Sequence, residues 1–374
     1  MIKRQLQKVI EANLFKGKII VIYGARQVGK TTLAKQILES VPNSSYINSE
    51  LLQNKAALET TNVQQLKSFL GNHRLIVIDE AQQISKIGLK LKILIDTFPD
   101  MQIIATGSSS FELKEKVFEP LTGRSRIYHL YPLSAAELIQ HSNIMNVNAN
   151  LENILRFGLY PEVYENTESE AVEELNNITS NYLYKDILQF GDLRRSDLVY
   201  NLLRALALQI GNEVSYNELA NKLGENVATI KRYIELLEKV FVIFRLSSYS
   251  NNLRKEIAKG KKIYFYDLGI RNTIIQNYNQ LNLRNDVGAL WENFCITERL
   301  KINHYSRRFV NSYFWRTYDQ KEIDYIEEYS GKLDAFEFKY SQTKKIKPPK
   351  AFLEKYSNSS YRVINQESVW DFIQ

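Results

Sequence analysis

The sequence lacks the features that mark secreted, membrane-spanning or zinc-ribbon proteins. Its one cysteine, Cys295, excludes an intramolecular disulfide and a cysteine-based zinc cluster, and points to a reducing compartment. No apolar run approaches the roughly 18 to 20 residues that span a bilayer. The N-terminus has basic residues, but no apolar stretch and cleavage site with small residues follow them. The sequence therefore does not predict a secretory signal. We expect a cytoplasmic protein with no membrane partner.

Repeats, low-complexity tracts and long glycine- or serine-rich linkers are also missing, so domain boundaries must be inferred from changes of pattern. A chain of 374 residues is too long for one compact core and indicates two to four domains. The formal charge of +7 and the isoelectric point of about 9.1 are compatible with a nucleic-acid partner. Such a charge does not prove that partner, because charge governs association rather than fold. Taken alone, it fits a basic, non-binding surface better.

Residues 1–135 alternate short apolar runs with polar-faced helical segments. Continuous β-branched runs separated by helices are typical of a buried parallel sheet with helices on both faces. The sequence therefore predicts an α/β fold here, with strands at residues 18–23, 45–48, 75–79 and 102–106.

A glycine-rich segment, Gly24-Ala-Arg-Gln-Val-Gly-Lys-Thr31, follows the first predicted strand and precedes a predicted helix. This is the context that a phosphate-binding loop requires. Backbone N–H groups would surround the phosphates, Lys30 would reach the β and γ oxygens, and the Thr31 hydroxyl would coordinate Mg²⁺. We expect ATP and Mg²⁺ as ligands, with the nucleotide held by Gly24, Ala25, Arg26, Gln27, Val28, Gly29, Lys30, Thr31 and Thr32.

Two acidic residues, Asp79 and Glu80, end the third predicted strand. We expect Asp79 to hold Mg²⁺ through water and Glu80 to polarise the attacking water, an arrangement suited to hydrolysis of a phosphoanhydride. The next strand ends in a polar cluster where a γ-phosphate sensor would lie. Ser108 is the preferred sensor and Thr106 the second choice, although such clusters also cap helices.

An arginine, Arg124, follows in the segment Leu121-Thr-Gly-Arg124. Two interpretations stay open. Arg124 could reach the γ-phosphate of a neighbouring subunit in a homo-oligomer, or it could form a surface salt bridge.

The middle of the chain is predicted to be helical. Ser134 and Glu137 form a capping box at the start of a segment that would cover the nucleotide as a lid. A second box, Ser215 with Glu218, opens a helix that ends at Gly224. With the helix at residues 228–239, it fits a helix-turn-helix carrying Thr229, Lys231, Arg232 and Tyr233.

Two strands, residues 240–245 and 262–266, would form the wing of that module. Winged helices bind DNA but also serve as protein-interaction or lid modules. A basic group near the second strand could contact phosphates or form a solvated loop; it consists of Arg254, Lys255, Lys259, Lys261 and Lys262.

The C-terminal part carries acidic residues and a lysine on a predicted hairpin. Asp324 begins one strand, while Glu337 and Lys339 lie two residues apart and so face the same side of the next. Two carboxylates can hold Mg²⁺, and a lysine can orient the hydrolytic water. Glu292, on an upstream helix, could complete the metal site. Arg316 is a candidate phosphate ligand, with a salt bridge as the equal alternative.

The Lys30–Thr31 loop, the Asp79–Glu80 strand end and the sensor strand resemble the AAA+ ATPases. Further segments resemble a prokaryotic subfamily with a C-terminal domain of nuclease-like fold: Thr106-Gly-Ser-Ser109, Leu121-Thr-Gly-Arg124, Tyr131-Pro-Leu-Ser134 and Gly158-Leu-Tyr-Pro-Glu162. Leu159 departs from this pattern, where a second glycine is expected. The resemblance implies an AAA+ core (1–135), a helical lid (136–192), a winged helix (193–275) and a restriction-endonuclease-like PD-(D/E)xK domain (276–374).

The leading hypothesis is an ATPase whose cycle serves binding or cleavage of nucleic acid, with DNA as the partner. The alternative is a signalling or scaffolding ATPase whose end domain binds a partner without cutting it; a phosphate-loop kinase is a weaker third. Catalytic roles fall on Lys30, Glu80, Ser108, Arg124, Asp324, Glu337 and Lys339, and metal binding on Thr31, Asp79, Glu292, Asp324 and Glu337.

Overall fold

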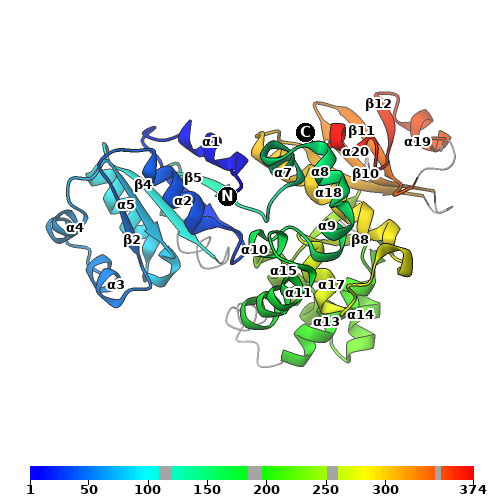
Figure 1. The fold of residues 1–374 in the computed structure, drawn as a ribbon, viewed down its shortest axis with the longest axis horizontal. Helices are drawn as coiled ribbons and strands as arrows, with labels where there is room; N and C mark the ends of the chain where they lie inside the picture. The colour runs from blue at the N-terminus through cyan, green and yellow to red at the C-terminus, as the bar shows by residue number, and fades with distance from the viewer. Residues whose placement is uncertain (109–119, 184–195, 251–259, 318, 320, 342–346) are drawn as a thin grey trace. The chain divides into compact units, whose positions relative to one another are not determined.

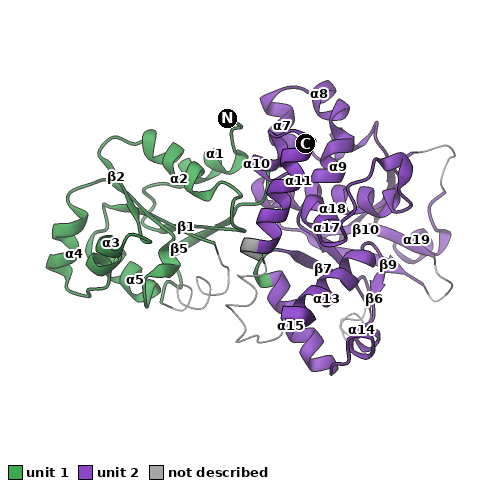
Figure 2. Ribbon diagram, turned by 60° about the horizontal axis from the view of Figure 1, so that its bottom comes forward, with its two compact units in different colours: residues 1–133, 239–241 green, residues 134–238, 242–374 purple. Residues whose placement is uncertain are grey.

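The computed structural model describes the chain except for residues 109–119, 184–195, 251–259, 318, 320 and 342–346, and except for the side chains of residues 181–183 (Figure 1). The chain divides into two compact units (Figure 2). Unit 1 comprises residues 1–133 with 239–241, and unit 2 comprises residues 134–238 with 242–374. No helix in the described part of the chain is long and apolar enough to cross a membrane.

Unit 1 contains a parallel five-stranded sheet, which confirms the predicted α/β fold. Its apolar strands are almost fully buried, as expected for a sheet covered on both faces. In spatial order the strands are β2(Ser44–Asn48), β3(Leu75–Asp79), β4(Gln102–Gly107), β1(Ile19–Tyr23) and β5(Ser125–His129). The sequence did not predict β5, because Ser-Arg-Ile-Tyr-His lacks a continuous apolar run.

Four α-helices and a 3₁₀ turn connect the described strands of unit 1, and one α-helix precedes the first strand. The core lies between the sheet and these helices and includes Leu66, Leu91 and Leu94. The elements are α1(Gln5–Glu11), α2(Lys30–Glu39), α3(Leu52–Leu58), α4(Val63–Leu70), α5(Ile87–Thr97) and η1(Ala81–Gln83).

Residues 239–241 also belong to unit 1, although residues 134–238 of unit 2 separate them in the sequence from the rest of it. The ring of Phe241 lies 4.0 Å from that of His129 and 5.3 Å from that of Tyr23, measured between ring centroids. Tyr23 and His129 end the neighbouring strands β1 and β5. Phe241 therefore packs against the end of the sheet from which the glycine-rich segment leaves.

The helices of unit 2 begin with the predicted capping box, since the Ser134 side chain accepts the N–H of Glu137 and the Glu137 side chain accepts the N–H of Ser134. The first group of elements is α7(Ala135–His141), α8(Ile144–Ala149), α9(Leu151–Phe157), α10(Pro161–Tyr164), α11(Glu168–Asn177) and the π-helical segment η2(Ile178–Leu183). The second group is α13(Ser196–Leu208), α14(Tyr216–Leu223), α15(Val227–Lys239), α17(Leu268–Ile274), η3(Leu281–Leu283), α18(Val287–Tyr305), α19(Lys350–Lys355) and α20(Val369–Phe372).

A mixed seven-stranded sheet runs through unit 2. In spatial order its strands are β12(Ser359–Ile364), β11(Lys332–Phe338), β10(Glu322–Tyr329), β9(Asn311–Arg316), β7(Ile243–Ser248), β8(Lys261–Phe265) and β6(Glu213–Val214). β7 and β9 pair in parallel through only two residue pairs. The strands predicted as a wing and those of the C-terminal part thus share one sheet. The finer division into lid, wing and end domain stays a prediction.

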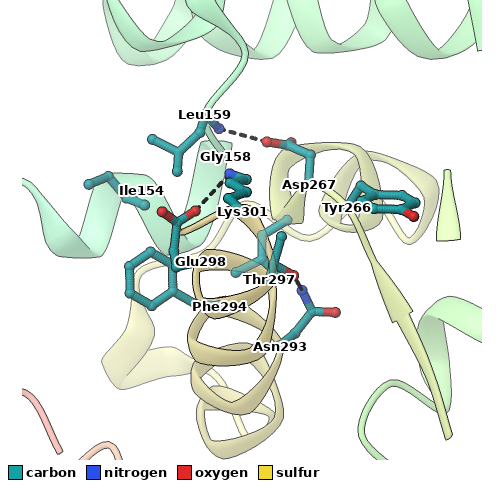
Figure 3. Close-up of a pocket in the computed structure, with 11 residues that line it drawn as sticks. Ile154, Gly158, Leu159, Tyr266, Asp267, Asn293, Phe294, Thr297, Glu298 and Lys301 are labelled. Atoms are coloured by element: carbon teal, nitrogen blue, oxygen red, sulfur yellow. Dashed lines mark hydrogen bonds and ion pairs between the residues drawn. The ribbon is translucent and has the colours of Figure 1, made fainter. Parts of the chain in front are cut away.

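Gly158 lies where two parts of unit 2 pack closely. Its φ is +78°, and a Cβ there would lie 2.1 Å from Oδ1 of Asp267. The buried Asp267 carboxylate accepts the N–H of Leu159 at 2.7 Å (Figure 3). It also accepts the N–H of Ile270 at 3.2 Å. Burial raises the pKa of Asp267. The expected second glycine at position 159 is not required, because Leu159 is not among the residues with a positive φ and its side chain is buried.

We predict that Gly158→Ala destabilises unit 2 by about 2 kcal/mol, since it strains the backbone and displaces the Asp267 carboxylate from two amides. Gly288→Ala is the matched control, because Gly288 lies in α18 with no atom within 4 Å of an added Cβ. Alanine in a helix should leave stability unchanged or raise it. Thermal unfolding of both variants checks the prediction, and equal melting temperatures would contradict it.

Candidate functional site

The glycine-rich segment forms the turn between β1 and α2, as predicted. Gly24 has no room for a side chain, because a Cβ would lie 2.1 Å from the carbonyl oxygen of Leu130. Gly29 caps α2 with a φ of +93°, a conformation that favours glycine. The segment therefore curls directly onto a helix N-terminus, where backbone N–H groups attract anions.

Lys30 is the first residue of α2 and is buried. Its ammonium donates to the carbonyl oxygen of Ala25 at 2.6 Å and to that of Gly24 at 3.1 Å. The side chain is thus folded across its own loop. An ammonium in this position can exchange these carbonyl oxygens for phosphate oxygens.

Asp79 ends β3 and accepts hydrogen bonds from three hydroxyl groups. Thr31 donates to Oδ2 at 2.8 Å, Tyr46 donates to Oδ2 at 2.5 Å, and Thr106 makes a short bond to Oδ1. Burial and the Asp79 carboxylate raise the pKa of Tyr46. The structure therefore brings together Thr31 and Asp79, whose oxygens are the ligands that Mg²⁺ prefers.

Glu80 lies next to this group with a left-handed backbone, φ +52° and ψ +43°. Its N–H donates to Thr106 Oγ1 at 3.1 Å, and its carboxylate accepts a short bond from Gln82 and a bond of 3.3 Å from Ser108. Gln82 also donates to Ser108 at 2.9 Å. A non-glycine residue in this conformation is strained, and such strain clusters at functional sites.

Three residues of this site were not predicted from the sequence: Arg4, Tyr46 and Gln82. The buried Arg4 guanidinium donates to the carbonyl oxygens of Val28 and Tyr131, both at 2.6 Å. Arg4 therefore joins the glycine-rich segment to the chain that leaves β5. No local pattern in the sequence marks Arg4. Tyr46 lies on a predicted strand, and it could have been identified if β2 had been placed beside β3, as it is in the structure.

Arg124 forms an ion pair within the chain. Its Nε lies 2.7 Å from Oδ1 of Asp96, and both side chains are more than two-fifths exposed. This is the surface salt bridge that the sequence left open as one alternative. The other alternative, a role toward the nucleotide of a second subunit, stays a prediction.

The structure also brings together the predicted C-terminal residues. Asp324 of β10 accepts the N–H of Phe338 at 2.8 Å, and Lys339 donates to Glu337 at 2.7 Å. Burial and the Asp324 carboxylate raise the pKa of Glu337, and the same two causes raise the pKa of Glu292 to about 7. The four side chains share one electrostatic environment.

Glu292, Glu322, Asp324 and Glu337 form an acidic group, and a lysine that was not predicted at this site lies among them. Lys262 is 1% exposed, its Nζ lies 2.9 Å from Oε1 of Glu292, and it forms a short ion pair with Glu322. Burial acts to lower the pKa of Lys262, but Glu292, Asp324 and Glu322 together raise it. The sequence placed Lys262 in a basic, phosphate-contacting or solvated group, and this was wrong. Three members of that group, Arg254, Lys255 and Lys259, lie outside the described residues.

The acidic group does not form a ready metal site. In the described part of the chain, no set of three or more His, Cys, Asp or Glu side chains is arranged to hold a metal ion. Arg316, the candidate phosphate ligand, forms ion pairs of 3.5 Å with Glu322 and with Glu213. The Arg316 ion pairs are the salt-bridge alternative that the sequence left open. The first observation differs from the expected arrangement of Glu292, Asp324 and Glu337 around Mg²⁺, because Lys262 already pairs with Glu292 and Lys339 with Glu337.

Comparison with known families covers most of the chain. Residues 16–139 match the family described as an AAA domain. Residues 148–281 and 287–370 match two domains of unknown function, DUF8612 and DUF4143, whose descriptions name no activity. The chain therefore contains an AAA domain, and the two further domain families follow it along the sequence.

Similar proteins come from bacteria and archaea. An uncharacterized protein of Mycobacterium tuberculosis is 26% identical over 337 residues, which cover 89% of this chain and 73% of the relative. An uncharacterized protein of Methanocaldococcus jannaschii is 27% identical over 313 residues, covering 73% and 65%. Among solved structures, a Walker-type ATPase of Pyrococcus abyssi aligns with a TM-score of 0.51 and 18% identity over 74% of this chain and 96% of that chain. The last likeness concerns the fold alone.

We predict that Arg4→Met loosens the glycine-rich segment, because it removes the donor that holds the Val28 and Tyr131 carbonyls. Hydrogen exchange at the amides of residues 26–31 should become at least about tenfold faster, as expected for the loss of about 1.4 kcal/mol from a charged hydrogen bond. Lys3→Met is the matched control, because the adjacent Lys3 is exposed. Unchanged exchange in Arg4→Met would show that Arg4 does not hold this segment.

Proposed function

We propose that the AAA domain hydrolyses ATP with Mg²⁺ at the site between the glycine-rich segment and the ends of β3 and β4. The observation that carries this proposal is the hydrogen-bonded group of Thr31, Asp79 and Thr106 beside the strained Glu80. Simple nucleotide binding would require the loop alone. A second acidic residue, held beside the first by Gln82 and Ser108, favours activation of water.

Each residue has a distinct role in this proposal. Lys30 and the backbone of residues 24–32 bind and orient the phosphates, and Thr31 and Asp79 would hold the Mg²⁺ that neutralises phosphate charge. Glu80 accepts a proton from the attacking water. Ser108, hydrogen-bonded to both Gln82 and Glu80, senses the γ-phosphate. Arg124 completes the site of a neighbouring copy after exchanging its ion pair with Asp96 for phosphate.

We predict that Lys30→Ala abolishes nucleotide binding, because it removes the ammonium that meets the phosphates. Glu80→Gln should bind ATP with near-normal affinity but hydrolyse it about 10²- to 10⁴-fold more slowly, since only proton transfer is lost. Titration with a fluorescent ATP analogue and release of free phosphate measure the two effects. Equal loss of binding in both variants would contradict these roles, and transfer of phosphate to an acceptor would indicate a kinase.

For unit 2 we propose nucleic-acid binding through α14 and α15. The two helices are joined by a short turn in which Gly224 has a left-handed backbone and the Asn226 side chain accepts the N–H of Thr229. Lys231 and Arg232 are exposed on α15 and can meet phosphates, whereas Tyr233 is buried and packs in the core. The formal charge of +7 is compatible with this partner.

We predict that the double variant Lys231→Ala, Arg232→Ala weakens binding to a fluorescent DNA duplex and lowers the salt dependence, d log K/d log [salt], by about 2. The charge-matched control is Lys3→Ala, Lys67→Ala, which removes two exposed lysines of unit 1. Fluorescence anisotropy at several salt concentrations gives both numbers. Identical slopes for the two variants would reject α15 as the contact, and no DNA binding by the wild type would favour the scaffolding alternative.

Of the two C-terminal functions considered, binding without cleavage is the better supported. Metal-dependent cleavage requires carboxylates free to coordinate an ion. Here Lys262 faces Glu292 and Glu322, and Lys339 faces Glu337. Cations of the chain itself thus already pair with three of these carboxylates, and the fourth, Asp324, accepts a backbone N–H.

A further inference from the structure

The lysine of β8 reaches the acidic group from a different part of the fold. Glu292 comes from α18, Glu322 and Asp324 from β10, and Glu337 from β11, whereas Lys262 comes from the strand expected to form a wing. We propose that the Lys262 ammonium occupies the place of a divalent ion beside Glu292. The acidic group is then a buried ion-pair network that holds β8, α18 and β10 together, and not a metal site. This inference does not depend on ATP hydrolysis.

Every carboxylate of the group has a partner within the protein. Glu292 accepts from Lys262 at 2.9 Å and from the Tyr264 hydroxyl at 2.6 Å, both at Oε1. Glu322 pairs with Lys262 and with Arg316. The remaining two carboxylates are served by the N–H of Phe338, which donates to Asp324, and by the ammonium of Lys339, which donates to Glu337. Such complete pairing is what burial of charge requires.

The backbone that carries Lys262 is fixed in place. β8 pairs antiparallel with β7 along its whole length, from Ile243 opposite Phe265 to Ser247 opposite Lys261. At the end of β8, Phe265 exchanges two hydrogen bonds with the Asn293 side chain, at 2.8 and 2.9 Å. Asn293 is adjacent to Glu292 on α18. The same helix therefore positions the carboxylate and anchors the strand that delivers its cation.

Withdrawal of Lys262 would leave Glu292 and Glu322 close to Asp324 without their ammonium. Removing one partner of a buried ion pair is strongly unfavourable, because the other charge stays buried. A divalent ion could replace the ammonium only if the Lys262 side chain, which is 1% exposed, left the group, because β8 itself is paired on both sides with β6 and β7. We therefore infer that the folded protein excludes the ion, and that removal of the lysine would create a site for it.

Binding of Mn²⁺ alone, without nucleotide, tests the inference. All proteins carry Asp79→Asn, so that the AAA domain cannot contribute a metal site. Electron paramagnetic resonance counts bound Mn²⁺ for the parent, for Asp324→Asn, for Lys262→Ala, and for Lys262→Ala with Asp324→Asn. We expect at least about tenfold tighter Mn²⁺ binding in Lys262→Ala than in the parent, and loss of that gain when Asp324 is also changed.

Thermal unfolding gives a second measurement. Lys262→Ala should melt at a lower temperature than the parent, and Mn²⁺ should raise the melting temperature of this variant but not that of the parent. Lys262→Met, which keeps most of the side-chain volume, replaces the alanine variant if the latter does not fold. Tight Mn²⁺ binding by the parent that is lost with Asp324→Asn would overturn the inference. So would failure of both Lys262 variants to gain Mn²⁺ binding.

Discussion

The fold of unit 1 depends at its functional edge on one carboxylate. Asp79 accepts hydrogen bonds from Thr31 of α2, Tyr46 of β2 and Thr106 of β4, and thus ties three neighbouring elements to the end of β3. A buried carboxylate is costly unless such donors surround it. The donors that make burial of Asp79 tolerable are the same groups that place it beside the glycine-rich segment, so stability of the edge and readiness of the site have one cause.

Most of unit 1 could be predicted because its signals are local. Apolar runs marked β1, β3 and β4, and glycine spacing marked the turn before Lys30, since a tight turn restricts residue type directly. Arg4, Gln82 and the mixed strand β5 could not be predicted. Their positions follow from contacts between distant segments, as when Arg4 meets Tyr131, and no periodicity records such contacts.

Unit 2 shows the same limit more strongly. The alternation along β10 and β11 predicted that Asp324, Glu337 and Lys339 would share a region, because strand geometry fixes which residues face one side. The sequence did not reveal that β7 pairs with β9, which joins the two groups of strands in one sheet. Since that pairing and the contacts of β8 with α18 bring Lys262 to Glu292, a lysine that looked like surface charge became a buried counter-ion.

The return of residues 239–241 to unit 1 has a consequence for synthesis on the ribosome. The rings of Tyr23 and His129 are made early, but Phe241 leaves the ribosome only after residues 134–238 of unit 2. Unit 1 therefore cannot reach its final packing as an independent N-terminal intermediate. Its nascent form lacks Phe241 at the sheet end next to the glycine-rich segment until the helices up to α15 have emerged.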